Sequence, residues 1–257
     1  MTLVRSRDGT SIAYERIGSG PAVILVGGGA GDRSENAPLH AELRAGFTVV
    51  NYDRRGRGLS GDTLPYAVER EIEDIEALIA EVGGSAHLYG VSSGGALALE
   101  AAAAGLAIEK VAVYEVPYNL DDDWPQRWRE YVDTLGALLA EDRRGDAFAL
   151  FMRVAGAPEE AIASARESPM WPDLEALAHT LAYDAACLGD GRPPTARLAT
   201  IEQPTLVLTG GGGEFYVPAA DAIAASIPRA ERLVLEGDSH VADPNVLAPV
   251  LERFFSG

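Results

Sequence analysis

The residues best suited to chemistry in this chain are at positions 90–94, which read Gly-Val-Ser-Ser-Gly. An extended run over residues 86–89 precedes them, and a run typical of a helix follows over residues 95–102. A strand that turns sharply into a helix at a G-x-S-x-G pattern exposes the serine hydroxyl, and the glycines leave room for the turn. The N-terminus of the helix favours negative charge beside that hydroxyl. The pattern predicts that Ser92 is a nucleophile; an ordinary strand-to-helix loop is the alternative.

A serine nucleophile needs a general base, and the chain contains four histidines. His240 follows the last predicted strand, whereas His40 falls in a predicted surface helix and His87 in a predicted strand. Functional loops cluster at the carboxyl ends of the strands in open α/β sheets. We therefore expect His240 to take the Ser92 proton and to return it to the leaving group, with a capping or loop histidine as the alternative.

Backbone amides for an oxyanion hole are expected in a glycine-rich loop. Residues 27–31 read Gly-Gly-Gly-Ala-Gly and follow a wholly apolar run. An oxyanion hole needs two N–H donors aimed at one point. We expect Ser93 to supply one donor, and Gly28 and Gly29 are the candidates for the other. A phosphate-binding loop is the alternative, although the Lys-Ser/Thr pair of a P-loop is missing.

Apolar periodicity predicts the elements that must position these residues. Strands are expected at residues 2–6, 11–16, 22–26, 47–52, 87–89, 111–114, 205–208 and 232–235, and helices at 66–82, 95–102, 124–139, 146–154, 158–166, 171–188 and 246–255. A hairpin followed by alternating strands and helices predicts an α/β fold with a largely parallel sheet. Residues 118–192 contain no convincing strand, which predicts a helical cap inserted after the sixth strand.

Over essentially its whole length the chain resembles the α/β-hydrolase superfamily. The landmarks are the hairpin, the glycine loop, the Ser92 turn, the helical insertion, the final histidine and residues 53–60, which read Asp-Arg-Arg-Gly-Arg-Gly-Leu-Ser. The resemblance implies a core of residues 1–117 and 195–257, and a helical cap of residues 118–194. It implies that Gly29 is the loop's oxyanion donor. It also implies that residues 53–60 form a structural turn near the active site, with a solvated arginine-rich loop as the alternative.

The acid of a catalytic triad is where the chain departs from this family. Many relatives have an aspartate after the seventh strand, but residues 209–218 contain none. Glu214, four positions before Pro218, is one candidate. The other is Glu115, at the end of the sixth strand, where haloalkane dehalogenases and some related hydrolases carry their acid. We favour Glu115, with Glu214 as the alternative, and a dyad or a water-mediated arrangement stays open.

The nucleophile type limits the reaction that the resemblance implies. Dehalogenases and epoxide hydrolases of this fold use an aspartate, whereas this chain has Ser92. The expected reaction is therefore attack on an ester, lactone or thioester, formation of an acyl-enzyme and its hydrolysis, as in a carboxylesterase. The alternatives are a cofactor-free non-hydrolytic enzyme of this fold (a perhydrolase or haloperoxidase, a lyase or a biosynthetic cyclase) and an inactive ligand-binding protein.

Aromatic and neighbouring side chains of the predicted cap are candidates for substrate contacts. They are Trp124, Trp128, Met170, Trp171, His179 and Tyr183. A pocket lined by such side chains suits an apolar small molecule. Packing of the cap on itself is the alternative.

Composition argues against several classes of partner. A net charge of −18 argues against nucleic acid and against an anionic membrane surface. Cys187 is the single cysteine, which excludes an internal disulfide and a cysteine metal cluster. We expect no metal and no cofactor. Because no apolar stretch reaches the length of a signal peptide or membrane span, we expect a cytoplasmic protein. We also expect a monomer or a homodimer.

Overall fold

A mostly parallel sheet forms the centre of the computed structural model, which describes residues 1–211, 215–237 and 239–257. Within these residues the strands are β1 (Thr2–Arg5), β2 (Ser11–Gly18), β3 (Ala22–Val26), β4 (Thr48–Tyr52), β5 (Ala86–Val91), β6 (Ile108–Tyr114), β7 (Thr205–Thr209) and β8 (Ala230–Val234). They form one sheet in the order β1-β2-β4-β3-β5-β6-β7-β8. Only the β1–β2 and β2–β4 pairs are antiparallel. The predicted α/β class and largely parallel sheet are confirmed.

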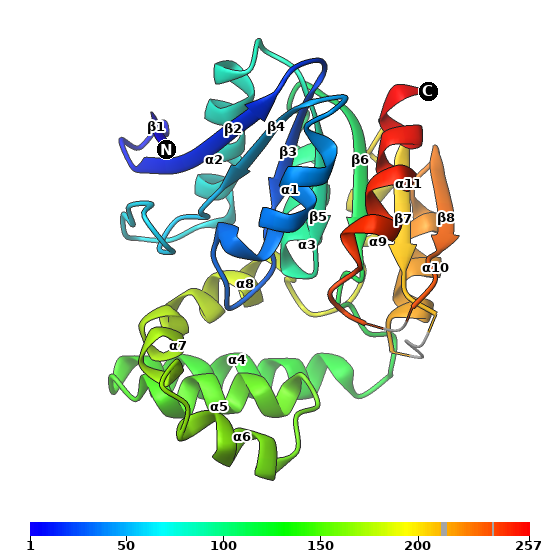
Figure 1. The fold of residues 1–257 in the computed structure, drawn as a ribbon. Helices are drawn as coiled ribbons and strands as arrows, with labels where there is room; N and C mark the ends of the chain where they lie inside the picture. Colours follow the sequence, from blue (N-terminus) through cyan, green and yellow to red (C-terminus); the bar gives the residue numbers. More distant parts are fainter. Residues whose placement is uncertain (212–214, 238) are drawn as a thin grey trace.

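Helices cover both faces of this sheet (Figure 1). The helical segments are η1 (Arg33–Asn36), α1 (Ala37–Leu43), α2 (Val68–Glu81), α3 (Ser93–Ala103), α4 (Trp124–Ala140), α5 (Arg144–Val154), α6 (Glu159–Arg166), α7 (Trp171–Leu177), η2 (Ala178–Thr180), α8 (Leu181–Cys187), α9 (Thr195–Leu198), α10 (Tyr216–Ser226) and α11 (Pro244–Ser256). Side chains of α1 and α11 pack in one apolar core, and those of α2, α3 and α10 pack in the other.

Strand β3 explains why the central strands are apolar throughout. All five of its residues are buried. Val23 and Leu25 point into the core with α1 and α11, whereas Ile24 and Val26 point into the core with α2 and α3. Since side chains alternate across a strand, a strand covered on both faces needs an unbroken apolar run.

Residues 115–204, all of which the structure describes, contain helices and no strand. We call the part from α4 to α8 the insert; it lies beyond one edge of the sheet, in the lower part of Figure 1. Its aromatic residues join the apolar core on the α2 and α3 side. The chain segments that lead into and out of the insert meet where the Asn119 N–H donates to Gly191 O, at 2.9 Å. The division into domains at residues 118 and 194 stays a prediction.

The prediction of one continuous helix over residues 171–188 is wrong. The structure breaks it at η2 into α7 and α8. The Thr180 hydroxyl donates to Leu177 O at 2.8 Å, and His179 Nδ1 lies 3.0 Å from Ala176 O. These side chains compete for carbonyl groups that a continuous helix uses for its own backbone bonds.

Across the described part of the chain, none of the helices combines the length and the apolar character that crossing a bilayer requires.

Two glycine substitutions test how closely the elements approach. A Cβ on Gly94 would overlap Gly27 O, a backbone atom that cannot turn away, so Gly94→Ala is expected to cost about 3 kcal/mol of unfolding free energy. Gly136, inside α4, has no atom within 4 Å of its Cβ position, so Gly136→Ala is expected to add about 0.5–1 kcal/mol. Urea unfolding measures both. A Gly94→Ala variant as stable as the parent protein would contradict the close approach.

Candidate active site

Ser92 occupies a strained turn between β5 and α3. Its φ of 54° and ψ of −127° lie outside the regions that non-glycine residues ordinarily adopt. Its N–H donates to Tyr114 O, at 2.9 Å, which holds the turn against the end of β6. Cβ atoms on Gly90 and Gly94 would overlap Gly94 O and Gly27 O. The turn therefore requires glycine on both sides and lifts Ser92 clear of the strand.

Glu115 and His240 meet at the same edge of the sheet. Glu115 follows β6, is 2% exposed and has a φ of 48°. Its Oε2 lies 2.7 Å from His240 Nδ1, and its Oε1 accepts the Gly210 N–H at 2.9 Å. The alternative acid, Glu214, lies outside the residues that the structure describes. The carboxylate with which His240 makes contact is thus the one that sequence analysis favoured.

Two tyrosines that sequence analysis did not single out contact the loop that follows β8 and carries His240, which we call the histidine loop. The Tyr216 ring stacks flat on the His240 ring, with centroids 4.9 Å apart and planes 9° apart. The Tyr114 hydroxyl donates to Ser239 O at 2.6 Å. Burial, and then the charge of Glu115, raise the pKa of Tyr216 to about 12, so it stays a neutral ring beside the imidazole. Among the described residues no hydrogen bond joins Ser92 Oγ to the His240 ring; such bonds often tighten only when substrate binds.

Polar side chains surround the backbone of the glycine loop. The Gly28 N–H donates to Glu35 Oε2 at 3.1 Å, and Gly28 O accepts from Arg57 Nη1. Within the described residues, the amides of Gly29 and Ser93 donate no hydrogen bond to the protein. Of the three predicted oxyanion donors, Gly28 is therefore engaged with Glu35, whereas Gly29 and Ser93 have no acceptor among the described residues, and their role stays a prediction.

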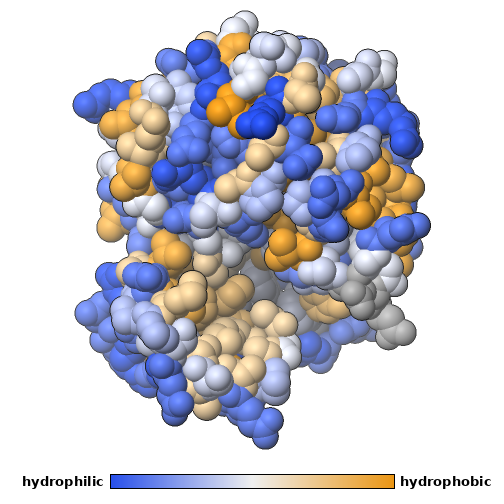
Figure 2. All heavy atoms as spheres, in the orientation of Figure 1, coloured by the Kyte–Doolittle hydropathy of each residue, from blue (hydrophilic) through white to orange (hydrophobic). Residues whose placement is uncertain are grey.

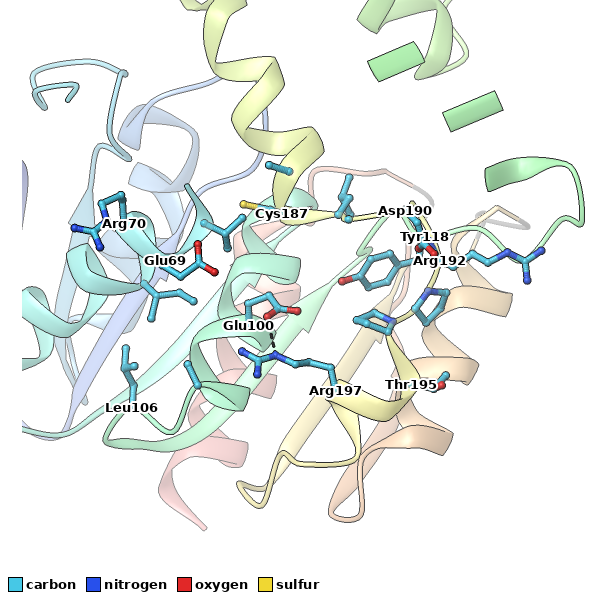
Figure 3. Close-up of a pocket in the computed structure, with 18 of the residues that line it drawn as sticks. Glu69, Arg70, Glu100, Leu106, Tyr118, Cys187, Asp190, Arg192, Thr195 and Arg197 are labelled. Atoms are coloured by element: carbon cyan, nitrogen blue, oxygen red, sulfur yellow. Dashed lines mark hydrogen bonds and ion pairs between the residues drawn. The ribbon is translucent and has the colours of Figure 1, made fainter. Parts of the chain in front are cut away.

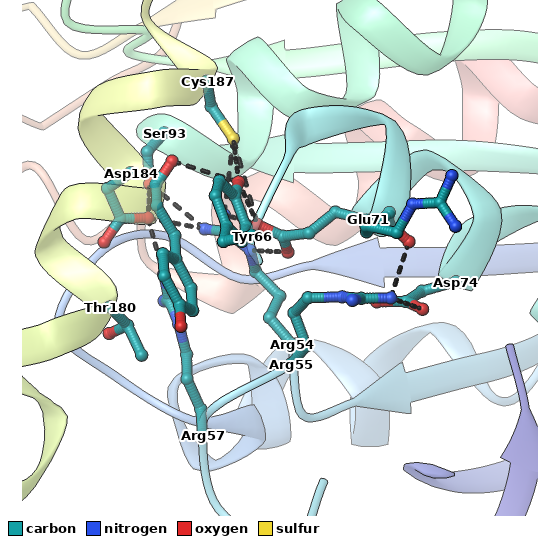
Figure 4. A network of polar contacts seen from close by, with 12 residues as sticks. Arg54, Arg55, Arg57, Tyr66, Glu71, Asp74, Ser93, Thr180, Asp184 and Cys187 are labelled. Atoms are coloured by element: carbon teal, nitrogen blue, oxygen red, sulfur yellow. Dashed lines mark hydrogen bonds and ion pairs between the residues drawn. The ribbon is translucent and has the colours of Figure 1, made fainter. Parts of the chain in front are cut away.

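The arginines of residues 53–60 are buried, so the interpretation of this segment as a solvated loop is wrong for them. Arg54 and Arg57 are 1% and 2% exposed, and both donate to Asp184 of α8 (Figure 4). Arg54 also binds Glu71 through two bonds of 2.8 and 2.7 Å. Burial tends to raise the pKa of Glu71, but the charges of Arg54 and Arg57 and the hydrogen bonds from Arg54 and Tyr66 together lower that pKa. Ser93 Oγ completes the group by donating to Asp184 at 2.8 Å.

The tryptophans predicted to contact substrate are buried in the insert. Trp124 and Trp128 stack on one another with centroids 5.9 Å apart, and Trp124 also meets Phe215 at 6.2 Å. Phe215 contacts Tyr216, the ring that stacks on His240. Trp171 packs edge-on against a phenylalanine of α5 at 5.7 Å. Trp124 is therefore linked to the histidine loop through aromatic contacts, whereas Trp171 packs inside the insert.

The other predicted substrate residues make contacts of a different kind. Met170 is 65% exposed. The Tyr183 hydroxyl donates to Asp62 Oδ2 at 2.8 Å, and His179 Nε2 lies 3.5 Å from the same atom. The recorded partners of Tyr183 and His179 thus join the insert to the loop after β4. Their role in substrate binding stays a prediction.

Two of the hollows among the described residues border the insert or the segment that leaves it. The face in Figure 2 is hollowed where the insert meets the core, with hydrophobic residues along the insert's side. A second hollow, of about 1270 Å³, lies between α2, α3 and the segment that leaves the insert (Figure 3). Ser92, Glu115 and His240 are not among its lining residues. The described residues contain no group of three or more His, Cys, Asp or Glu side chains that could hold a metal ion.

Comparisons with known proteins give one consistent result. Residues 23–250 match the family model described as "Alpha/beta hydrolase family". The chain is 32% identical to a pimeloyl-[acyl-carrier protein] methyl ester esterase of Xanthomonas campestris, over 93% of this chain and 96% of that protein. A solved alpha/beta hydrolase from Sphaerobacter thermophilus has 50% identity and a TM-score of 0.90, covering 99% of this chain and 100% of that chain. The enol-lactonase of Burkholderia xenovorans, at 22% identity, a TM-score of 0.73 and full coverage of both chains, is similar in fold.

The buried carboxyl of Glu35 is expected to make the stability of the protein depend on pH. Burial raises the pKa of this carboxyl, which lies near Arg57 and Asp184. A raised carboxyl pKa contributes stability below the unfolded pKa, about 4.3, and that contribution is lost as pH rises through the folded pKa. Glu35→Gln keeps an acceptor for the Gly28 N–H but cannot ionise. The unfolding free energy of Glu35→Gln, relative to that of the parent protein, is therefore expected to increase as the pH rises from about 4 to about 7. This interval begins near the unfolded pKa of about 4.3.

Urea unfolding at a series of pH values measures this difference. Glu167→Gln, at an exposed position of the insert, controls for the loss of one negative charge. A difference that stays constant over the whole interval would contradict the assignment to Glu35.

Proposed function

We propose that this chain, which belongs to the alpha/beta hydrolase family, is a serine hydrolase that cleaves an ester, lactone or thioester bond through an acyl-enzyme. The observation that carries the proposal is the contact of 2.7 Å between Glu115 and His240, at the sheet edge where the Ser92 turn projects. A carboxylate, an imidazole and a strained serine that follow strands β6, β8 and β5 of one sheet are the parts of a catalytic triad.

In the first half of the reaction, Ser92 Oγ attacks the carbonyl carbon and His240 Nε2 takes its proton. The carbonyl oxygen becomes an oxyanion as the new C–O bond forms. The amides of Gly29 and Ser93, which donate no hydrogen bond to the described part of the protein, are the donors that we assign to it. The N-terminus of α3 adds a favourable partial charge at the same place.

In the second half, the protonated His240 gives its proton to the leaving oxygen or sulfur as the bond to carbon breaks. The acyl group then remains on Ser92. His240 next takes a proton from water, whose oxygen attacks the acyl carbon, and returns the proton to Ser92 as the acid leaves.

Glu115 orients the imidazole in both halves. Its carboxylate accepts the Nδ1–H, which leaves Nε2 unprotonated in the neutral ring and stabilises the imidazolium that forms. The Gly210 N–H holds the other oxygen of this carboxylate, so the acid has one orientation. The Tyr216 ring limits the imidazole to one plane.

Ester cleavage is the reaction that we favour, in the manner of a carboxylesterase. The relative from Xanthomonas campestris, which aligns with 93% of this chain, is named as a methyl ester esterase. An apolar small-molecule substrate suits the hydrophobic side of the hollow in Figure 2. We assign Trp124 to substrate binding because aromatic contacts through Phe215 and Tyr216 link it to His240. We assign the insert the role of a cap over this hollow.

Labelling of Ser92 tests the nucleophile. A fluorescent fluorophosphonate is expected to form a stoichiometric adduct on Ser92, located by mass spectrometry, because the base activates this hydroxyl. Ser92→Ala is expected to abolish both the adduct and the hydrolysis of short p-nitrophenyl esters, and His240→Ala to suppress the adduct. Circular dichroism verifies that each variant is folded. An unlabelled but folded protein would overturn the proposal in favour of a lyase or a ligand-binding protein.

Two glutamine substitutions test the acid. Glu115→Gln is expected to lower kcat by about 10³- to 10⁴-fold, because the amide no longer stabilises the imidazolium or selects its tautomer. Glu214→Gln is expected to leave kcat within a few-fold of the parent value. Steady-state ester hydrolysis measures both. The reverse result, a large loss for Glu214→Gln alone, would transfer the role to Glu214.

A further inference from the structure

We propose that Asp184, in helix α8 of the insert, is a positioning residue that holds both donors of the oxyanion hole in place. This inference rests on the proposed function. It goes beyond it because Asp184 belongs to the insert, whereas Ser92, Glu115 and His240 all belong to the sheet edge.

The contacts of Asp184 converge on one oxygen atom. Its Oδ1 accepts from Arg54 Nη1 at 2.7 Å, from Arg57 Nη2 at 2.6 Å and from Ser93 Oγ at 2.8 Å (Figure 4). Asp184 is 6% exposed, and Arg54 and Arg57 are almost fully buried. Charge-assisted hydrogen bonds inside a protein are short and strongly directional. Asp184 therefore fixes where the two guanidinium groups and the Ser93 side chain lie.

The guanidinium groups in turn orient the glycine loop. Arg57 Nη1 donates to Gly28 O, and Arg54 Nη1 lies 3.4 Å from Gly27 O. In a trans peptide the C=O and the next N–H point in opposite directions, so the Arg57 contact directs the Gly29 N–H away from Arg57. A Cβ on Gly28 would lie 3.3 Å from Ser92 Cβ, which places this stretch of backbone against the nucleophile.

The second donor is held from the other side. Ser93 is the first residue of α3, and its side chain is tied to Asp184 while its amide is the other proposed donor. One carboxylate thus connects the glycine loop after β3 with the turn after β5. Because Asp184 contacts both sides, the spacing between the Gly29 and Ser93 amides depends on that connection. This spacing matters because an oxyanion hole works only when its donors are preorganised.

Removal of the negative charge is expected to release both sides. Arg54 would keep Glu71, but Arg57 would lose its carboxylate in a buried place, which is costly and favours rearrangement. Asp184→Asn is therefore expected to lower kcat by about 10²-fold, as the loss of one oxyanion donor does, with KM within a few-fold. Affinity for a trifluoromethyl ketone, a transition-state analogue, is expected to fall in parallel with kcat/KM.

Asp74→Asn is the matched control. Asp74 is 1% exposed and binds Arg55, the third buried arginine of residues 53–60, through bonds of 2.8 and 2.7 Å. In the described structure Asp74 makes no hydrogen bond or ion pair with the glycine loop or with Ser93. It is expected to lower stability, as Asp184→Asn does, and to leave kcat and analogue affinity unchanged. An equal loss of activity in both variants, or none in Asp184→Asn, would overturn the proposal.

Ser93→Ala keeps the test decisive if Asp184→Asn does not fold. It removes the Asp184 contact but retains the Ser93 amide, and it is expected to lower kcat and analogue affinity severalfold. Unchanged values would count against positioning. Failure of the proposed function gives a distinct result: Ser92→Ala would then retain activity, whereas failure of the Asp184 proposal alone leaves Ser92→Ala inactive and Asp184→Asn fully active.

Discussion

Three guanidinium groups are buried at the carboxyl edge of the sheet, and carboxylates from distant parts of the chain meet each of them. Arg54 binds Glu71 and Asp184, Arg57 binds Asp184, and Arg55 is paired with carboxylates of its own. A buried charge is tolerated only when it is paired and hydrogen-bonded. The pairs of Arg54 and Arg57 therefore hold α2, the loop after β4 and the insert in one arrangement, and these two arginines also contact the carbonyl groups of the glycine loop.

Parallel strands bring the rest of the chemistry to the same edge. Ser92, Glu115 and His240 follow β5, β6 and β8, and the glycine loop follows β3, which pairs with β5. Each of these residues sits where a strand ends and the backbone leaves the sheet. Ser92 and Glu115 both adopt positive φ there, so two non-glycine residues are strained at adjacent strands. Such strain persists only when the surrounding structure holds it.

Features of the fold and the site could be predicted from the sequence where they depend on neighbouring residues, and not where they depend on contacts between distant positions. The Ser92 turn and the buried strands have local signatures in glycine spacing and apolar runs, and the resemblance to the family limited the candidate acids to Glu115 and Glu214. Asp184 contacts residues 130 and 127 positions away, so no local pattern could indicate it. Tyr216 and Glu35 were missed for the same reason. The substrate role of Met170 stays a prediction, because composition indicates an apolar side chain but not the direction in which it points.

The narrow junction at Asn119 and Gly191 gives the insert the character of an exchangeable module. Its two ends leave the core almost at one point, so a replacement of different length would add little entropy cost to closing the connection. A different set of helices could therefore take the place of the insert while the sheet stays unchanged. A replacement without a carboxylate at the place of Asp184 would remove the ion pairs that Arg54 and Arg57 make with the insert. Compatibility between an exchanged module and its scaffold then depends in part on one acidic position.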